Sequence, residues 1–120
     1  FFVSADVGMG EFMIKNFEAM ACGCVLLAYD QGEAESRALG LQDMHNIVFY
    51  QTIAQLQEKL AQLRADPELA RRIADNGREL VVVQLSFARI GERIVEALKP
   101  ALRTRAPLSL LEKVRLKLGV

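Results

Sequence analysis

Two glutamates and a glycine-rich loop are the residues of this 120-residue chain whose types and spacing suggest chemistry. Glu11 and Glu18 lie seven residues apart, in a segment predicted to be a helix from about Glu11 to Cys22 and opened by Gly10. Seven steps of about 100° bring the second carboxylate almost under the first, roughly 10 Å along the axis. A helix start preceded by glycines also favours phosphate, because its first backbone N–H groups have no partner within the helix. The pattern therefore predicts a ligand with both phosphates and hydroxyl groups, such as a nucleotide sugar.

The predicted helix stops at Gly23 and continues into an apolar strand, and this combination resembles a known motif. Phe17–Gly23, followed by Val25–Ala28, is similar to the donor-site motif of GT-B glycosyltransferases. The branch it resembles is the bacterial group-1 family that includes the spore-protein-like glycosyltransferases. A weaker resemblance continues from Leu56 to about Leu98. The resemblance implies a fold of two Rossmann-like domains that face a cleft, and this chain would match the last part of the C-terminal, donor-binding domain.

The resemblance implies that the loop and the helix bind the donor. We expect the backbone N–H groups of residues 10 to 13 to face its diphosphate or sugar, and the Glu18 carboxylate to accept hydrogen bonds from the ribose. Glu11 is one residue later than the family's usual acid. It either contacts the transferred sugar or is a first-turn acid that favours the positive end of the helix dipole. The expected donor-binding residues are Gly8, Gly10, Glu11, Phe12, Met13 and Glu18.

Each of these residues also has a purely structural interpretation. The glycine loop is then a tight strand-to-helix turn, and Glu18 is an exposed acid paired with Lys15, three residues earlier. We expect Lys15 to be a surface ion-pair partner and His45, the only histidine, to be a loop residue. A group of acids follows the apolar strand and either contacts the donor or forms a solvated turn; it comprises Asp30, Glu33 and Glu35.

The implied reaction needs no metal and no cofactor, since the nucleotide sugar is itself a substrate. In the resembled family the catalytic base and the acceptor site lie in the other domain, so no catalytic residue is assigned here. We expect this chain alone to be inactive. The alternative is a non-catalytic, helix-rich α/β interaction or oligomerisation module, and a third option is another α/β phosphate-binding protein.

The order of predicted elements indicates an α/β fold with an incomplete, Rossmann-like parallel sheet of about three strands, followed by three to four C-terminal helices. Strands are predicted at 1–5, 24–29 and 46–50. Later helices are predicted to begin after Thr52, Asp66, Ser86 and Pro107, with a break at Gly77 as one option. We assign residues 1–100 to a partial nucleotide-sugar-binding domain and 101–120 to a basic amphipathic helix or tail. So small a sheet leaves its edges open, which predicts self-association or marginal stability.

Charge and composition indicate which partners and which cellular location to expect for this protein. The chain has 15 acidic and 15 basic residues, but residues 1–50 carry seven acids and two bases, so the basic excess lies towards the C-terminus. With no net positive charge, nucleic acid is not an expected partner. The basic tail packs on the missing N-terminal acceptor domain, rests on an anionic membrane surface or is solvated. Cys22 and Cys24 are predicted to be buried free thiols in a cytoplasmic protein.

Overall fold

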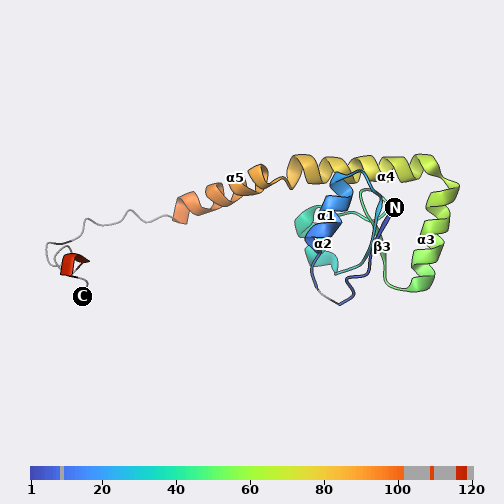
Figure 1. Ribbon diagram of the computed structural model, residues 1–120, viewed down its shortest axis with the longest axis horizontal. Helices are drawn as coiled ribbons and strands as arrows, with labels where there is room; N and C mark the ends of the chain where they lie inside the picture. The colour runs from blue at the N-terminus through green and yellow to red at the C-terminus, as the bar shows by residue number, and fades with distance from the viewer. Residues whose placement is uncertain (9, 102–108, 110–115, 119–120) are drawn as a thin grey trace. The chain divides into compact units, whose positions relative to one another are not determined.

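The computed structural model describes residues 1–8, 10–101, 109 and 116–118 (Figure 1). These residues form two units, Phe1–Ile90 and Gly91–Val120, and the first contains the sheet. The predicted basic helix or tail at 101–120 falls largely outside the described residues; of the part that is described, residues 116–118 are helical.

Three short strands form one parallel sheet. They are β1 (Phe2–Ser4), β2 (Leu26–Tyr29) and β3 (Val48–Tyr50), in the order β1-β2-β3. In the register of the sheet, Phe2 lies opposite Leu26 and Leu27 lies opposite Val48. The predicted α/β fold with an incomplete Rossmann-like sheet is confirmed.

The helices follow the predicted order, and polar side chains mark where three of them begin, at Thr52, Asp66 and Ser86. Their bounds are α1 Ile14–Ala21, α2 Glu33–Leu39, α3 Ile53–Ala65, α4 Pro67–Glu79, the π-helical turn η1 Leu80–Gln84, α5 Phe87–Leu98 and the 3-10 turn η2 Lys99–Ala101. The Thr52 hydroxyl accepts a hydrogen bond from the Gln55 N–H, and the Asp66 carboxylate accepts one from the Leu69 N–H, as expected of N-cap residues. Within the described part of the chain, no helix has the length and apolar character needed to cross a membrane.

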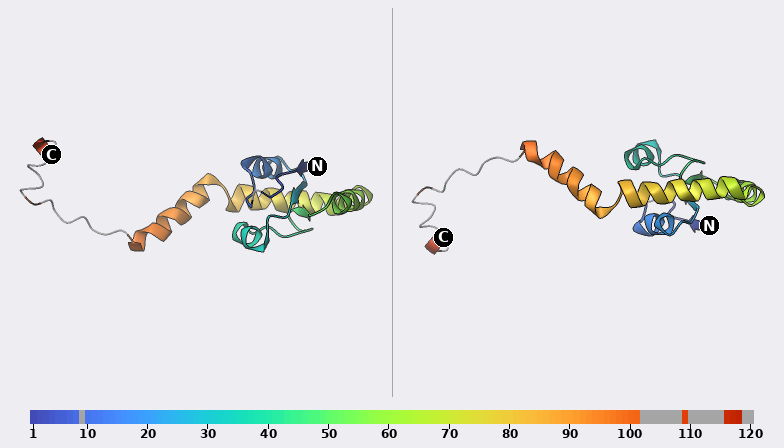
Figure 2. Two further views of the ribbon diagram at one scale, coloured as in Figure 1. Left: turned by 90° about the horizontal axis from the view of Figure 1, so that it is seen from below. Right: turned by 90° about the horizontal axis from the view of Figure 1, so that it is seen from above.

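The sheet is covered on both faces, which explains its continuous apolar strands. Successive side chains of β2 point to opposite faces, so Leu26 and Ala28 belong to one core cluster and Leu27 to the other. Side chains of α1 and η1 join the first cluster, and those of α3 and α4 join the second. In Figure 1, α1 and α2 lie on one side of the sheet and α3 on the other, while Figure 2 separates α1 from α2.

Helix α1 begins three residues later than predicted, at Ile14. The later start results from a tertiary contact. Phe12 is buried and its ring stacks on that of Phe49, with the ring centroids 6.0 Å apart. Met13 is accordingly extended, with φ −74° and ψ 153°. Glu11 therefore precedes the helix, and the predicted alignment of Glu11 with Glu18 on one helical face is wrong.

Helix α4 continues through Gly77 because it packs closely on the loop before β3. A Cβ atom at Gly77 would lie 2.6 Å from the backbone oxygen of Asn46. Asn46 is itself fixed, since its side chain accepts a hydrogen bond from the Gln42 N–H and donates one to the Gly40 carbonyl. The glycine thus permits a close approach of two elements, and the helical hydrogen-bonding pattern changes only at η1.

The two cysteines are free, as predicted, but they are not buried. Cys22 is exposed at the end of α1, and Cys24 is half-buried before the start of β2 at Leu26. The burial of the strand begins only at Val25, so the prediction of two buried thiols is wrong.

Candidate functional site

The loop between β1 and α1 is held by the carboxylate of Asp6. One oxygen accepts hydrogen bonds from the Ser4 hydroxyl at 2.6 Å and from the Asn16 amide at 3.3 Å. The other pairs with the Lys15 ammonium at 2.7 Å. The bonds from Lys15 and then Ser4 favour the ionised form and lower the pKa of Asp6 below its usual range. The loop is therefore tied back to the first turn of α1.

A second tether comes from Tyr50, at the end of β3. Its hydroxyl donates a buried hydrogen bond of 2.6 Å to the carbonyl of Ser4. Burial raises the pKa of Tyr50, and the nearby charge of Asp6 adds to that effect. The carboxyl ends of the first and third strands are thereby joined beside the loop.

Gly8 and Gly10 give the loop its shape. Both have left-handed backbone angles, with φ of 73° and 72°, which other residues rarely adopt. At either position an added Cβ would have no atom of the described, non-adjacent residues within 4 Å, so the requirement for glycine is conformational. The Gly10 N–H donates to the side-chain oxygen of Gln31 at 3.0 Å, and the Gln31 amide donates to the Asp6 carbonyl.

The start of α1 is open to an anion. Within the described residues, no side chain caps the helix at Met13. The Asn16 N–H bonds to the Met13 carbonyl at 2.9 Å. The N–H groups that precede it, at the positive end of the helix dipole, are suited to bind a negatively charged group. Glu11 and Met13 are exposed beside this helix end, whereas the Phe12 side chain belongs to the core.

Asn16 provides an unusual polar group beneath the loop. Its side chain is only 1% exposed, and its amide donates to Asp6. Its side-chain oxygen has no hydrogen-bond partner among the described residues. A buried acceptor without a partner is costly, and this one belongs to the first turn of α1.

Glu18 lies on the opposite side of α1 from Asn16. It is exposed and, among the described residues, forms no ion pair, since Lys15 pairs with Asp6 instead. Glu18 lines a cavity of about 590 Å³ along α1, together with apolar residues that include Phe17 and Leu85. Glu18 is thus exposed and not buried in the core, and it lines this largely apolar cavity.

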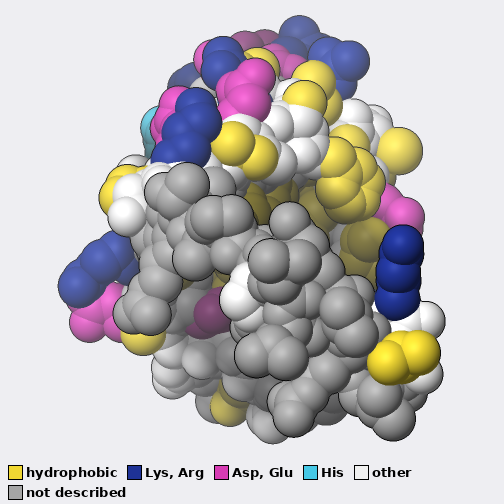
Figure 3. Space-filling view, turned by 90° about the vertical axis from the view of Figure 1, so that its left-hand side faces the viewer, with side chains coloured by type: hydrophobic (Ala, Val, Ile, Leu, Met, Phe, Trp, Pro, Cys, Tyr) yellow, Lys and Arg dark blue, Asp and Glu magenta, His cyan; other side chains and the backbone are white. Residues whose placement is uncertain are grey.

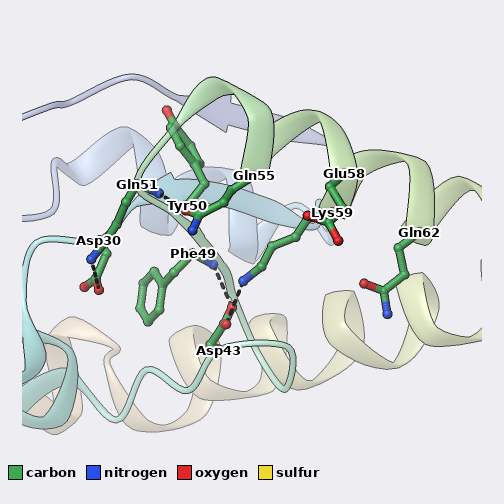
Figure 4. Close-up of a pocket in the computed structure, with 9 residues that line it drawn as sticks. All are labelled: Asp30, Asp43, Phe49, Tyr50, Gln51, Gln55, Glu58, Lys59 and Gln62. Atoms are coloured by element: carbon green, nitrogen blue, oxygen red, sulfur yellow. Dashed lines mark hydrogen bonds and ion pairs between the residues drawn. The ribbon is translucent and has the colours of Figure 1, made fainter.

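A second, polar pocket of about 360 Å³ lies beside the end of β3 (Figure 4). The Asp43 carboxylate accepts from the Phe49 N–H at 2.8 Å and pairs with Lys59 at 2.7 Å. The side chain of Gln51 reaches Asp30 at 3.4 Å. These contacts connect the β3–α3 junction to the turn that follows β2.

The remaining candidates have structural roles. Asp30 accepts a hydrogen bond of 2.9 Å from the Gly32 N–H and so shapes the turn before α2. Glu33 pairs with Arg37 within that helix. His45 lies in an exposed turn, as predicted, and its carbonyl accepts from the Asn76 amide at 3.0 Å.

The sequence interpretation missed three residues that shape the site: Asp6, Asn16 and Gln31. Asp6 and Gln31 each follow a strand at the carboxyl edge of the sheet, where α/β proteins bind ligands, and that position was the available signal. Asn16 carries no such signal, because only the fold shows that it is buried. Across the described residues, no group of three or more His, Cys, Asp or Glu side chains is placed to hold a metal ion.

Comparison with known proteins gives two matches. The family described as glycosyl transferase-like matches residues 2–96 of the chain. Over 90 residues the chain is 33% identical to the alpha-maltose-1-phosphate synthase of Mycolicibacterium smegmatis, and the matched segment covers 69% of this chain. The chain spans only 23% of the length of that relative. No solved structure matches the chain.

Proposed function

Because the chain belongs to the glycosyl transferase-like family, we propose that it is the donor-binding part of a GT-B glycosyltransferase that uses a nucleotide sugar. The observation that supports this most directly is the uncapped start of α1, which follows a glycine loop at the carboxyl edge of a parallel sheet. The name of the relative, a maltose-1-phosphate synthase, is also consistent with a transferred sugar.

In this proposal, the backbone N–H groups at the start of α1 bind the diphosphate. They lower the energy of the negative charge that develops on the leaving group as the sugar is transferred. Glu18 accepts hydrogen bonds from the ribose in the cavity along α1, and Glu11 lies near the transferred sugar. The acceptor and the catalytic base belong to another part of the protein, so we expect these 120 residues alone not to transfer sugar.

A titration of the ¹⁵N-labelled chain with ADP, UDP and GDP tests the donor site. We expect chemical-shift changes at residues 8–15 and at Glu18 for at least one of the three nucleotides. Inorganic phosphate is the comparison: equal responses to phosphate and to all nucleotides would indicate a general phosphate-binding protein. The absence of any response at millimolar nucleotide would contradict the proposal.

The variant Glu18→Gln tests the ribose contact. Removing the charge weakens hydrogen bonds from the ribose hydroxyls, so we expect affinity for the preferred nucleotide to fall about tenfold. Glu58→Gln is the matched control, because Glu58 is also an exposed helical glutamate but lies on α3. Equal affinities for the two variants would remove Glu18 from the site.

The alternative function is a non-catalytic interaction module, and exposed apolar side chains favour it. Hydrophobic side chains are visible at the surface among charged ones (Figure 3). Phe87 is 87% exposed, and Val82 and Val83 are also exposed. A chain that ignores nucleotides but binds a protein partner through these residues would support this alternative.

A further inference from the structure

One side chain, that of Gln31, holds the glycine loop at two points. Its amide nitrogen donates to the backbone carbonyl of Asp6, and its oxygen accepts from the Gly10 N–H at 3.0 Å. In the sequence, Gln31 is 25 residues from Asp6 and 21 residues from Gly10. Since donor and acceptor belong to one planar amide, they fix the separation of the two ends of the segment between Asp6 and Gly10.

Such a clamp matters because, among the described residues of this segment, the two glycines are not held by packing. Gly8 and Gly10 lose more conformational freedom on ordering than other residues do. Both are exposed, and at neither would an added Cβ touch another atom, so packing does not restrict them. The Asp6 side chain anchors only the beginning of the segment.

The turn that carries Gln31 is itself fixed. Asp30 accepts a hydrogen bond from the Gly32 N–H at 2.9 Å, which closes the turn around Gln31. Gln51, from the end of β3, donates to Asp30 at 3.4 Å, as Figure 4 shows. The clamp is therefore supported by β2 and β3 rather than by the loop.

We infer that Gln31 is a positioning residue, which fixes the shape of the glycine loop beside the first turn of α1, where the helix N–H groups would receive a diphosphate. This inference rests on the proposed function. The inference also refines the proposed function. Because the Gly10 N–H is already bonded to Gln31, the anion binds to the first turn of α1 and not to the Gly10 N–H. Gln31 acts through the loop and contacts no phosphate.

Two variants separate the two bonds. Gln31→Met removes both and keeps the length of the side chain, whereas Gln31→Glu keeps an acceptor for Gly10 but cannot donate to Asp6. Gln57→Met is the control, because Gln57 is exposed on α3. We would measure the hydrogen-exchange rate of the Gly10 amide by NMR, and the affinity for the nucleotide that the wild-type chain prefers among ADP, UDP and GDP.

We expect the Gly10 amide to exchange at least severalfold faster in Gln31→Met, and near the wild-type rate in Gln31→Glu and Gln57→Met. Nucleotide affinity should fall about tenfold in Gln31→Met and stay unchanged in Gln57→Met. An unchanged Gly10 exchange rate in Gln31→Met would overturn the clamp. Faster exchange with unchanged affinity would overturn the positioning role. A wild-type chain that binds no nucleotide would instead overturn the proposed function, and the positioning role with it.

Discussion

Asp6 connects the candidate site to the stability of the fold through its charge. Its pKa is lowered in the folded chain from an ordinary value of 3.8, chiefly by Lys15. A lowered pKa means that the ionised carboxylate stabilises the fold above pH 4, and that this contribution is lost as pH falls through the folded pKa. The same interaction that orders the loop is therefore sensitive to acid.

We predict that Asp6→Asn reduces the free energy of unfolding at pH 7 and that the difference from wild type shrinks towards pH 2. Urea denaturation between pH 2 and pH 7 measures both. Asp75→Asn is a suitable control, because Asp75 is exposed on α4. A difference that stays constant over this pH range would show that Asp6 acts through something other than its charge.

At the scale of elements, the contact between α4 and the loop before β3 depends on Gly77. A Cβ there would lie 2.6 Å from the Asn46 backbone oxygen, which cannot move without disturbing its own loop. We predict that Gly77→Ala destabilises the fold by about 1–3 kcal/mol, despite alanine's higher helix propensity. Thermal or urea denaturation would measure this change.

Gly91→Ala provides the matched comparison. Gly91 is also helical, in α5, and outside the backbone of that helix no described residue has an atom within 4 Å of an added Cβ. The substitution should be neutral or stabilising by up to about 1 kcal/mol. If both alanine variants gained stability, the close approach at Gly77 would not be a constraint.

Most helices and strands were predicted correctly, because capping residues and hydrophobic periodicity lie within the element that they specify. Helices α3 and α4 begin at the predicted caps, Thr52 and Asp66. The position at which α1 starts was predicted wrongly because Phe12 is part of the core, where its ring stacks on that of Phe49, a residue far along the chain. Helical periodicity across residues 11–13 gave no sign of it.

The candidate site was predictable in its location but not in its contacts. Its glycines and the following helix stand out in the sequence, and so does the acid Glu18. The side chains that shape the loop do not, because Gln31 and Asp6 act on partners brought together only by the sheet. Long-range hydrogen bonds from ordinary polar residues leave no spacing pattern to detect.

At the scale of the whole molecule, we predict that the isolated chain self-associates. In the described part of the chain, each of β1 and β3 has a neighbouring strand on one side only, and Phe87, Val82 and Val83 are exposed. Open strand edges and apolar side chains both favour association in water. Sedimentation velocity at increasing concentration should reveal species larger than a monomer.

The variant Phe87→Ser should shift this equilibrium towards the monomer, while Ile53→Ser, which changes an exposed residue on α3, should have a smaller effect. A chain that stays monomeric at every concentration and unfolds only at high temperature would contradict the prediction.

The bond between the Tyr50 hydroxyl and the Ser4 carbonyl joins residues 46 positions apart. Closing a contact of such long range has an entropic cost, because it restricts the chain between the two residues. The docking of the third strand therefore contributes to the final shape of the loop. By linkage, any molecule that occupies the site would slow or oppose the unfolding of the entire sheet, so ligand binding should raise the melting temperature of the complete unit.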